Sequence, residues 1–120
     1  MSIEKEALRF IFPIELIEHF DIVSVQELGE VKAKQDYFHI VFEERPVIPE
    51  GADITEYESQ GFFSKTIQDF PIRGRAVFLE IKRRRWRHKE TGIGISRDFS
   101  FAIEGSKITK ELANFLKEGS

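Results

Sequence analysis

The sequence predicts an α+β fold, with an antiparallel sheet of about five strands and a helix near each end of the chain. Apolar residues recur at helical spacing at both ends, and alternating apolar and polar residues fill the middle. Pro and Gly separate the alternating runs, as turns require. The chain of 120 residues fits one domain, 1–120, divided into an acidic subregion 1–60, a basic hairpin subregion 61–105 and a terminal helix 106–120.

The first predicted elements are a helix and a hairpin. Residues 3–20 show helical spacing, and Pro13 lies inside that pattern. The helix is therefore expected to break there, or to restart with Pro13 near its first turn. Alternation predicts strands from about residue 22 to 27 and from 37 to 43, with Gly29 as a turn residue between them. We expect these two strands to pair as an antiparallel hairpin.

The remaining elements follow a stretch rich in Pro, Gly and acids at residues 45–61, which predicts a loop. Alternation resumes in three predicted strands, of which the middle one should be the longest: residues 62–70, 75–87 and 93–103. Turns are predicted between them at residues 71–74 and 89–92. Ser106 or Thr109 should cap a short C-terminal helix that runs to about Lys117.

Charge is distributed unevenly along the chain, whose formal net charge is −3. The first 60 residues carry 5 Lys and Arg against 14 Asp and Glu, whereas the last 60 carry 13 against 7. Residues 82–89 read KRRRWRHK, at the end of the predicted longest strand. A cationic run in an acidic protein indicates an anionic partner, and the phosphate backbone of nucleic acid is the commonest one.

Strand alternation places Arg83, Arg85 and Arg87 on one face, and Lys82, Arg84 and Trp86 on the other. Guanidinium groups bond phosphate oxygens bidentately, and a two-stranded ribbon is narrow enough to enter a major groove. Trp86 is expected either to stack on a base or to pack in the core. The alternative interpretation is a solvated strand end whose electrostatic partner is the acidic half of the chain.

Other function classes find little support in the sequence. There is no cysteine, and the three histidines lie on separate segments without the spacing typical of zinc ligands, so no metal and no cofactor is predicted. The acids are scattered and no nucleophile motif occurs, so we expect no enzyme. Residues 91–95 (TGIGI) are typical of a hairpin turn, not a phosphate loop. The N-terminus has neither a basic segment nor a long apolar one, so a cytoplasmic protein without membrane association is expected.

The segment 66–86 (TIQDFPIRGRAVFLEIKRRRW) resembles the N-terminal region of insertion-sequence transposases of the ISAon type. It is also similar to the zinc-ribbon region of a wider transposase group. The matching residues are Asp69, Pro71, Gly74, Val77, Leu79, Arg84, Arg85, Trp86 and Arg87. The zinc-ribbon members carry a cysteine where this chain has His88, so the metal does not carry over. The hairpin would instead be held by cross-strand pairs among Phe78, Trp86, Phe99 and Phe101.

The resemblance implies a non-catalytic DNA-binding domain of a transposase, because the family's catalytic acids lie in a separate C-terminal portion. Such a domain would hold or recognise mobile-element ends while a separate catalytic transposase chain does the chemistry. The expected nucleic-acid contacts are Arg73, Arg75, Lys82, Arg83, Arg84, Arg85, Trp86, Arg87 and Lys89. The alternatives are a protein-interaction module that docks on the catalytic chain, and binding to RNA instead of DNA.

Overall fold

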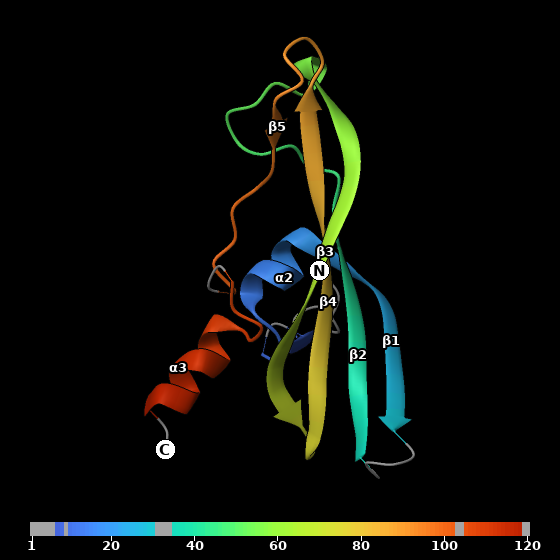
Figure 1. The fold of residues 1–120 in the computed structure, drawn as a ribbon, viewed down its shortest axis with the longest axis vertical. Coiled ribbons are helices and arrows are strands. Elements are labelled where there is room, and N and C mark those ends of the chain that lie inside the picture. The colour runs from blue at the N-terminus through green and yellow to red at the C-terminus, as the bar shows by residue number, and fades with distance from the viewer. Residues whose placement is uncertain (1–6, 9, 31–34, 103–104, 119–120) are drawn as a thin grey trace.

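The fold is an elongated α+β structure in a computed structural model that describes residues 7–8, 10–30, 35–102 and 105–118 (Figure 1). Its principal extents are 52 × 31 × 31 Å. The elements are, in chain order, α2 (Ile14–His19), β1 (Phe20–Glu30), β2 (Gln35–Glu44), the 3₁₀ helix η1 (Ile54–Glu56), β3 (Tyr57–Ile72), β4 (Arg75–His88), β5 (Gly94–Ile95) and α3 (Lys110–Glu118). The predicted α+β class with five strands is confirmed.

The sheet has the strand order β1-β2-β4-β3, and β5 pairs with β4 beyond the end of β2. Strands β1 and β2 form the predicted antiparallel hairpin, and β3 and β4 form a second one. However, β2 and β4 are parallel neighbours, so the sheet is mixed and not wholly antiparallel. We use the name ribbon for residues 57–64 of β3, residues 82–88 of β4 with the adjoining Lys89, and β5.

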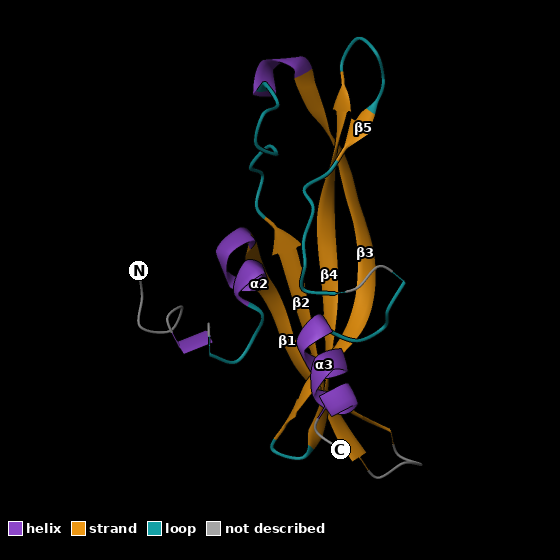
Figure 2. Ribbon diagram, turned by 90° about the vertical axis from the view of Figure 1, so that its left-hand side faces the viewer, coloured by secondary structure: helices purple, strands orange, loops and turns teal. Residues whose placement is uncertain are grey.

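The hydrophobic core lies on one face of the sheet, which α2 and α3 cover together (Figure 2). Alternation along β4 directs Val77, Leu79 and Ile81 to this face, where each is at most 1% exposed. Leu16 and Ile17 of α2 pack against them. Burying one such side chain stabilises the fold by roughly 1.5–3 kcal/mol, so this cluster fixes which face of β4 is turned inward.

Two local predictions in the N-terminal third have different outcomes. Pro13 is the N-cap of α2, so the helix does restart there, whereas the predicted residues 1–6 and 9 lie outside the described part. Gly29 is paired with Asp36 inside β1, so the prediction of a turn at Gly29 was wrong. The alternation that marks a strand continues through Gly29, which offers no side chain for either face.

The predicted loop 45–61 was wrong in its last part. The chain enters η1 at Ile54 and β3 at Tyr57, and β3 with 16 residues is longer than β4 with 14. A register shift between Ser59 and Phe62, with Gly61 at φ 87°, interrupts the alternation that would have identified this strand. The pairing of Tyr57 with His88 then supplies the hydrogen-bond partners that make the segment a strand.

The predicted returning strand 93–103 was also wrong, because only Gly94–Ile95 pairs with β4. The following segment leaves the sheet, and its last predicted residue, 103, lies outside the described part. Phe99 and Phe101 pack on Phe20, with ring centroids 5.1 and 6.3 Å apart. They therefore cover the core, and the predicted cross-strand set with Phe78 and Trp86 does not form. Two aromatic residues separated by one position are compatible with a strand paired with β4 and also with a segment that packs on the core, so their spacing did not distinguish the two.

Helix α3 is attached to β3 through a buried polar contact. Thr109 is 0% exposed, and its hydroxyl both accepts from the Leu112 amide (3.3 Å) and donates to Asp69 Oδ1 (2.9 Å). Thr109 is thus the predicted helix cap, while Ser106 bonds only within its own turn, to Ile108. Burial raises the pKa of Asp69, and its hydrogen bonds with the Phe70 backbone and with Thr109 oppose that rise only in part.

The raised pKa of Asp69 makes the stability of the fold depend on pH. Because the native state holds this proton more tightly than the unfolded chain, the contribution of Asp69 falls as pH rises from about 4 through the folded pKa. We expect Asp69→Asn to gain stability relative to the wild type over that range, since it cannot ionise. Urea unfolding of both proteins from pH 4 to 8 measures this. A difference that is constant, or that has the opposite sign, would contradict it. Asp69→Ala should lose about 1–2 kcal/mol near pH 4, because Thr109 loses its acceptor, and this loss should shrink as pH rises, because alanine cannot ionise either.

The turn between β3 and β4 contains a strained arginine. Arg73 has φ 50° and Gly74 has φ 75°, and the strands pair up to Ile72 and Arg75, which is typical of a two-residue type I′ turn. A left-handed conformation is costly for Arg and suits Asn. We expect Arg73→Asn to raise the free energy of unfolding by about 0.5–1 kcal/mol and Gly74→Ala to lower it by about 1 kcal/mol. Thermal unfolding of the two variants checks both signs.

Candidate nucleic-acid interface

The predicted cations do not form one patch. Arg73 and Arg75 lie at the β3–β4 turn, at the opposite end of β4 from Lys89 (Figure 1). Strand β4 is 14 residues long and therefore spans about 45 Å. Arg75 also pairs with Glu27 at 2.6 Å and lies 5.5 Å from the ring of Phe38. The candidate interface is therefore confined to the ribbon, where residues 82–89 lie.

Arg83 points toward the covered side of the sheet and not to solvent. Its guanidinium lies between two aromatic rings, 5.0 Å from that of Phe63 and 5.3 Å from that of Phe99, and it donates to the carbonyl of Arg97. Arg85 lies 4.7 Å from the same Phe63 ring. Each cation–π contact contributes about 0.5–2 kcal/mol, so Phe63 holds two arginines of the run in place.

Arg84 is held by a buried carboxylate at the end of β2. Its side-chain Nε donates to the carbonyl of Glu44 (2.8 Å), and its amide donates to Glu44 Oε1 (3.0 Å). Glu44 is 2% exposed, and the other carboxylate oxygen, Oε2, is buried with no hydrogen-bond partner among the described residues. Burial raises the pKa of Glu44, although the Arg84 amide and the charges of Arg83, Arg97 and Arg84 lower it. Desolvation is the larger effect.

The cations nearer the tip of the ribbon have weak, exposed partners. Arg87 pairs with Glu58, Lys89 Nζ donates to the Thr55 carbonyl at 2.9 Å, and His88 Nε2 lies 3.7 Å from a Glu56 oxygen. Exposed ion pairs contribute about 0–1 kcal/mol and are screened by salt. A phosphate can therefore replace these partners at little cost.

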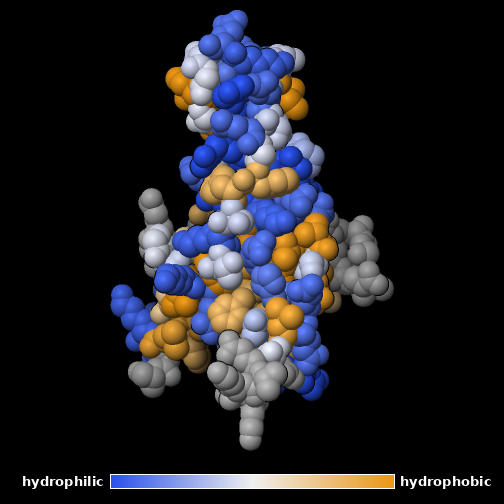
Figure 3. Space-filling model, turned by 45° about the vertical axis from the view of Figure 1, so that its right-hand side comes forward, coloured by the Kyte–Doolittle hydropathy of each residue, from blue (hydrophilic) through white to orange (hydrophobic). Residues whose placement is uncertain are grey.

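Within the described residues, the side chains of Lys82 and Arg85 make neither an ion pair nor a hydrogen bond to a carbonyl, unlike the other cations of the ribbon. Lys82 is half-buried on the face opposite the core, and Arg85 is exposed. The tip of the molecule, where the ribbon lies, is mainly hydrophilic, whereas apolar side chains gather over the lower part of the sheet (Figure 3). The charge of the ribbon is thus presented on a polar surface.

Trp86 is packed in the structure. It is 5% exposed, and it lies between Ser59 of β3 and Ile95 of β5 in the ladder. Of the two roles left open by the sequence, the structure shows packing, and the ring is not accessible for stacking on a base. Its Nε1 is buried without a hydrogen-bond partner in the described part of the chain.

Sequence reasoning did not identify which acids and aromatic residues would hold the arginines. Glu27, Glu44 and Glu58 come from the acidic half and contact Arg75, Arg84 and Arg87 respectively, so the alternative of an internal electrostatic partner holds for these arginines. The adjacent Phe62 and Phe63 each contact an arginine. These two aromatic residues lie on a strand that was expected to pair with the Arg-rich strand, so cation–π contacts between the two strands could have been predicted from the sequence.

The described residues contain neither a cluster of metal ligands nor a membrane-spanning helix. No group of three His, Asp or Glu residues converges there in a way that could bind a metal ion. No helix of the described part is long and apolar enough to cross a membrane.

The chain was compared with known families, curated proteins and solved structures. None of them matches it. The transposase relationship therefore stays a prediction carried by residues 66–87 alone.

Proposed function

We propose that the ribbon binds the phosphate backbone of DNA. The observation that carries this proposal is the presence of four cationic side chains along the ribbon, of which only Arg87 has an acidic partner in the described chain: Lys82, Arg85, Arg87 and Lys89. A ribbon of this width fits a major groove, and cations on both faces can reach the phosphates of both strands.

The inner arginines have a different role in this proposal. Arg83 and Arg84 are held by Phe63, Phe99 and Glu44, so they stiffen the ribbon and do not contact phosphate. A rigid ribbon loses less conformational entropy when its exposed cations bind. The contact set proposed from the sequence is thus reduced to the outer cations of the ribbon.

The proposed context is a transposase whose catalytic chain is separate, and the DNA would be the ends of a mobile element. The support is the order of features in residues 69–87: a turn, an apolar alternating strand and an Arg-rich aromatic end. The turn is present at Arg73 and Gly74, and the strand is β4. Asp69 is the first of the residues that carry the resemblance, and in this chain it accepts a hydrogen bond from Thr109 and so anchors α3.

The proposal is tested by fluorescence anisotropy with element-end duplex, random duplex, single-stranded DNA and single-stranded RNA. Three to four phosphate contacts predict a slope of log K against log salt of roughly −2.7 to −3.6 for duplex DNA. Duplex affinity should therefore fall roughly 50- to 150-fold between about 50 and 200 mM salt. Absence of binding to any duplex at low salt would contradict the proposal, and a preference for RNA would replace DNA as the ligand.

A protein-docking role is the second candidate, favoured by exposed apolar side chains away from the ribbon. Strand β1 is an edge of the sheet, where Val23 is 51% and Val25 is 64% exposed. Near the N-terminus Phe10 is 90% exposed, and on α3 Leu116 is 59% exposed. Size-exclusion chromatography with the catalytic transposase chain distinguishes protein docking from DNA binding. A complex held together by these apolar side chains should form without DNA and persist at high salt.

A further inference from the structure

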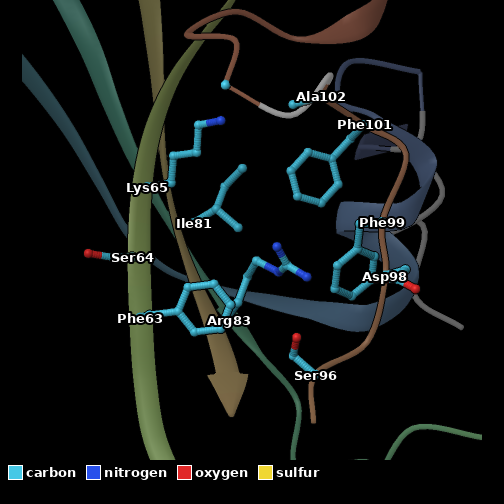
Figure 4. A pocket seen from close by; sticks show the side chains of 11 residues that line it. Phe63, Ser64, Lys65, Ile81, Arg83, Ser96, Asp98, Phe99, Phe101 and Ala102 are labelled. Atoms are coloured by element: carbon cyan, nitrogen blue, oxygen red, sulfur yellow. The ribbon is translucent and has the colours of Figure 1, made fainter. Parts of the chain in front are cut away.

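A cavity of about 690 Å³ lies at the foot of the ribbon, between the covered face of β3 and β4 and the segment that follows β5 (Figure 4). Its size is within the range of small-molecule sites. The segment forms the outer wall because it leaves the sheet after Ile95 and crosses the core face. No sequence pattern predicted a binding site here.

The cavity combines apolar walls with positive charge. Ile81, Phe99 and Phe101 provide the apolar surface, and the side chains of Lys65 and Arg83 extend into it from β3 and β4 (Figure 4). Asp98 is the one acidic residue among the described residues of the lining; it is exposed, and its carboxylate lies on the far side of the segment from the two cations (Figure 4). The lining therefore suits a ligand with a negative group and an apolar body.

Arg83 is oriented in advance for an anion. The rings of Phe63 and Phe99 fix its guanidinium plane, and within the described residues one of its nitrogens donates a hydrogen bond, to the carbonyl of Arg97. A guanidinium has five N–H donors, so others remain for a carboxylate.

We propose that this cavity binds a small organic anion, a carboxylate on an aromatic or other apolar body. The carboxylate oxygens accept hydrogen bonds from Arg83 and Lys65, and the body packs on Phe99, Phe101 and Ile81. This site is separate from the outer cations of the ribbon, so it does not depend on DNA binding.

The test is an NMR titration of the labelled protein with 2-naphthoate and with 2-naphthalenemethanol, which has the same ring system without the charge. We expect saturable binding of the carboxylate, with shifts at the amides of Lys65, Arg83 and Phe99, and affinity about tenfold higher than that of the alcohol. Equal affinity for the two probes, or no saturable binding of the carboxylate at millimolar concentration, would overturn the proposal.

A pair of charge-matched variants locates the site. Lys65→Met removes one cation from the cavity and keeps an apolar side chain of similar length, so naphthoate affinity should fall about fivefold while the alcohol is unaffected. Lys110→Met removes an exposed lysine of α3 outside the lining and should change neither affinity. An equal loss of naphthoate affinity in both variants would contradict binding at this cavity. Both lysines are exposed, and near-UV circular dichroism verifies that the variants are folded.

Discussion

Replacing Glu44 by alanine is expected to lower the free energy of unfolding by about 3 kcal/mol. Strand β2 ends at this residue, and its side-chain Oε1 accepts from the Arg84 amide, beyond the last paired residues, Glu43 and Lys82. Alanine leaves that amide without an acceptor, at a cost of about 1–3 kcal/mol. It also leaves a cavity where a fully buried side chain had been, which adds about 1–2 kcal/mol. The melting temperature should fall by roughly 10 °C.

The variant Glu44→Gln tests the contribution of the hydrogen bond from the Arg84 amide separately from that of the carboxylate charge. Burial raises the pKa of Glu44, which means that the ionised carboxylate is less favourable in the folded protein than in the unfolded chain. Glutamine keeps the acceptor and the volume, so its stability at neutral pH should lie within about 1 kcal/mol of the wild type. Urea unfolding measures both variants, with Glu43→Ala as a neighbouring control expected to change stability by less than about 0.5 kcal/mol. A loss in Glu44→Ala no larger than this control would refute the role assigned to Glu44.

The second large effect is expected on DNA binding, from the combined variant Lys82→Gln, Arg85→Gln and Arg87→Gln. Loss of three phosphate contacts should reduce the magnitude of the salt slope by about 2.7 and lower duplex affinity roughly 100-fold at low salt. The substitutions leave the contacts of Arg83, Arg84 and Glu44 intact. The fold should therefore be preserved, because within the described residues the triple variant removes only the exposed ion pair with Glu58 and the contact of Arg85 with the Phe63 ring.

The matched control for this variant removes the same number of charges from the other end of the molecule, at Lys107, Lys110 and Lys117. All three lysines are exposed, and none lies in the ribbon. The control should change the salt slope by less than about 1, because these side chains would meet no phosphate. An equal effect of the two triple variants would mean that net charge, and not the ribbon, governs the affinity.

Local sequence signals predicted much of the fold. The restart of α2 at Pro13, the β1–β2 hairpin and the cap at Thr109 depend on residues close in sequence, and each is present. The parallel pairing of β2 with β4 depends on a connection through the 45–53 loop and the β3 strand, and periodicity carries no information about such a partner. The start of β3 was hidden by the bulge at Gly61.

The candidate site was predicted less completely than the fold. The cationic run lies at a strand end, as expected. Its charges alone did not show, however, that Arg83 and Arg84 are held by contacts within the protein while the other cations face solvent. Glu44 and Arg84 are 40 residues apart, and they meet because β2 and β4 are neighbours. Alternation along β4 turns Arg83 to the core face, but Phe99 covers it there only because the segment after β5 leaves the sheet. Both arrangements arise from tertiary contacts.

The most direct test of the account is an NMR titration of the labelled protein with element-end duplex at low salt. Binding by the ribbon predicts the largest amide shifts in residues 82–89 and in the paired part of β3, residues 57–62. The β3–β4 turn at Arg73 and the edge strand β1 should show little change. Shifts concentrated on β1 or α3, with the ribbon unaffected, would contradict the central claim that the outer cations of the ribbon bind DNA.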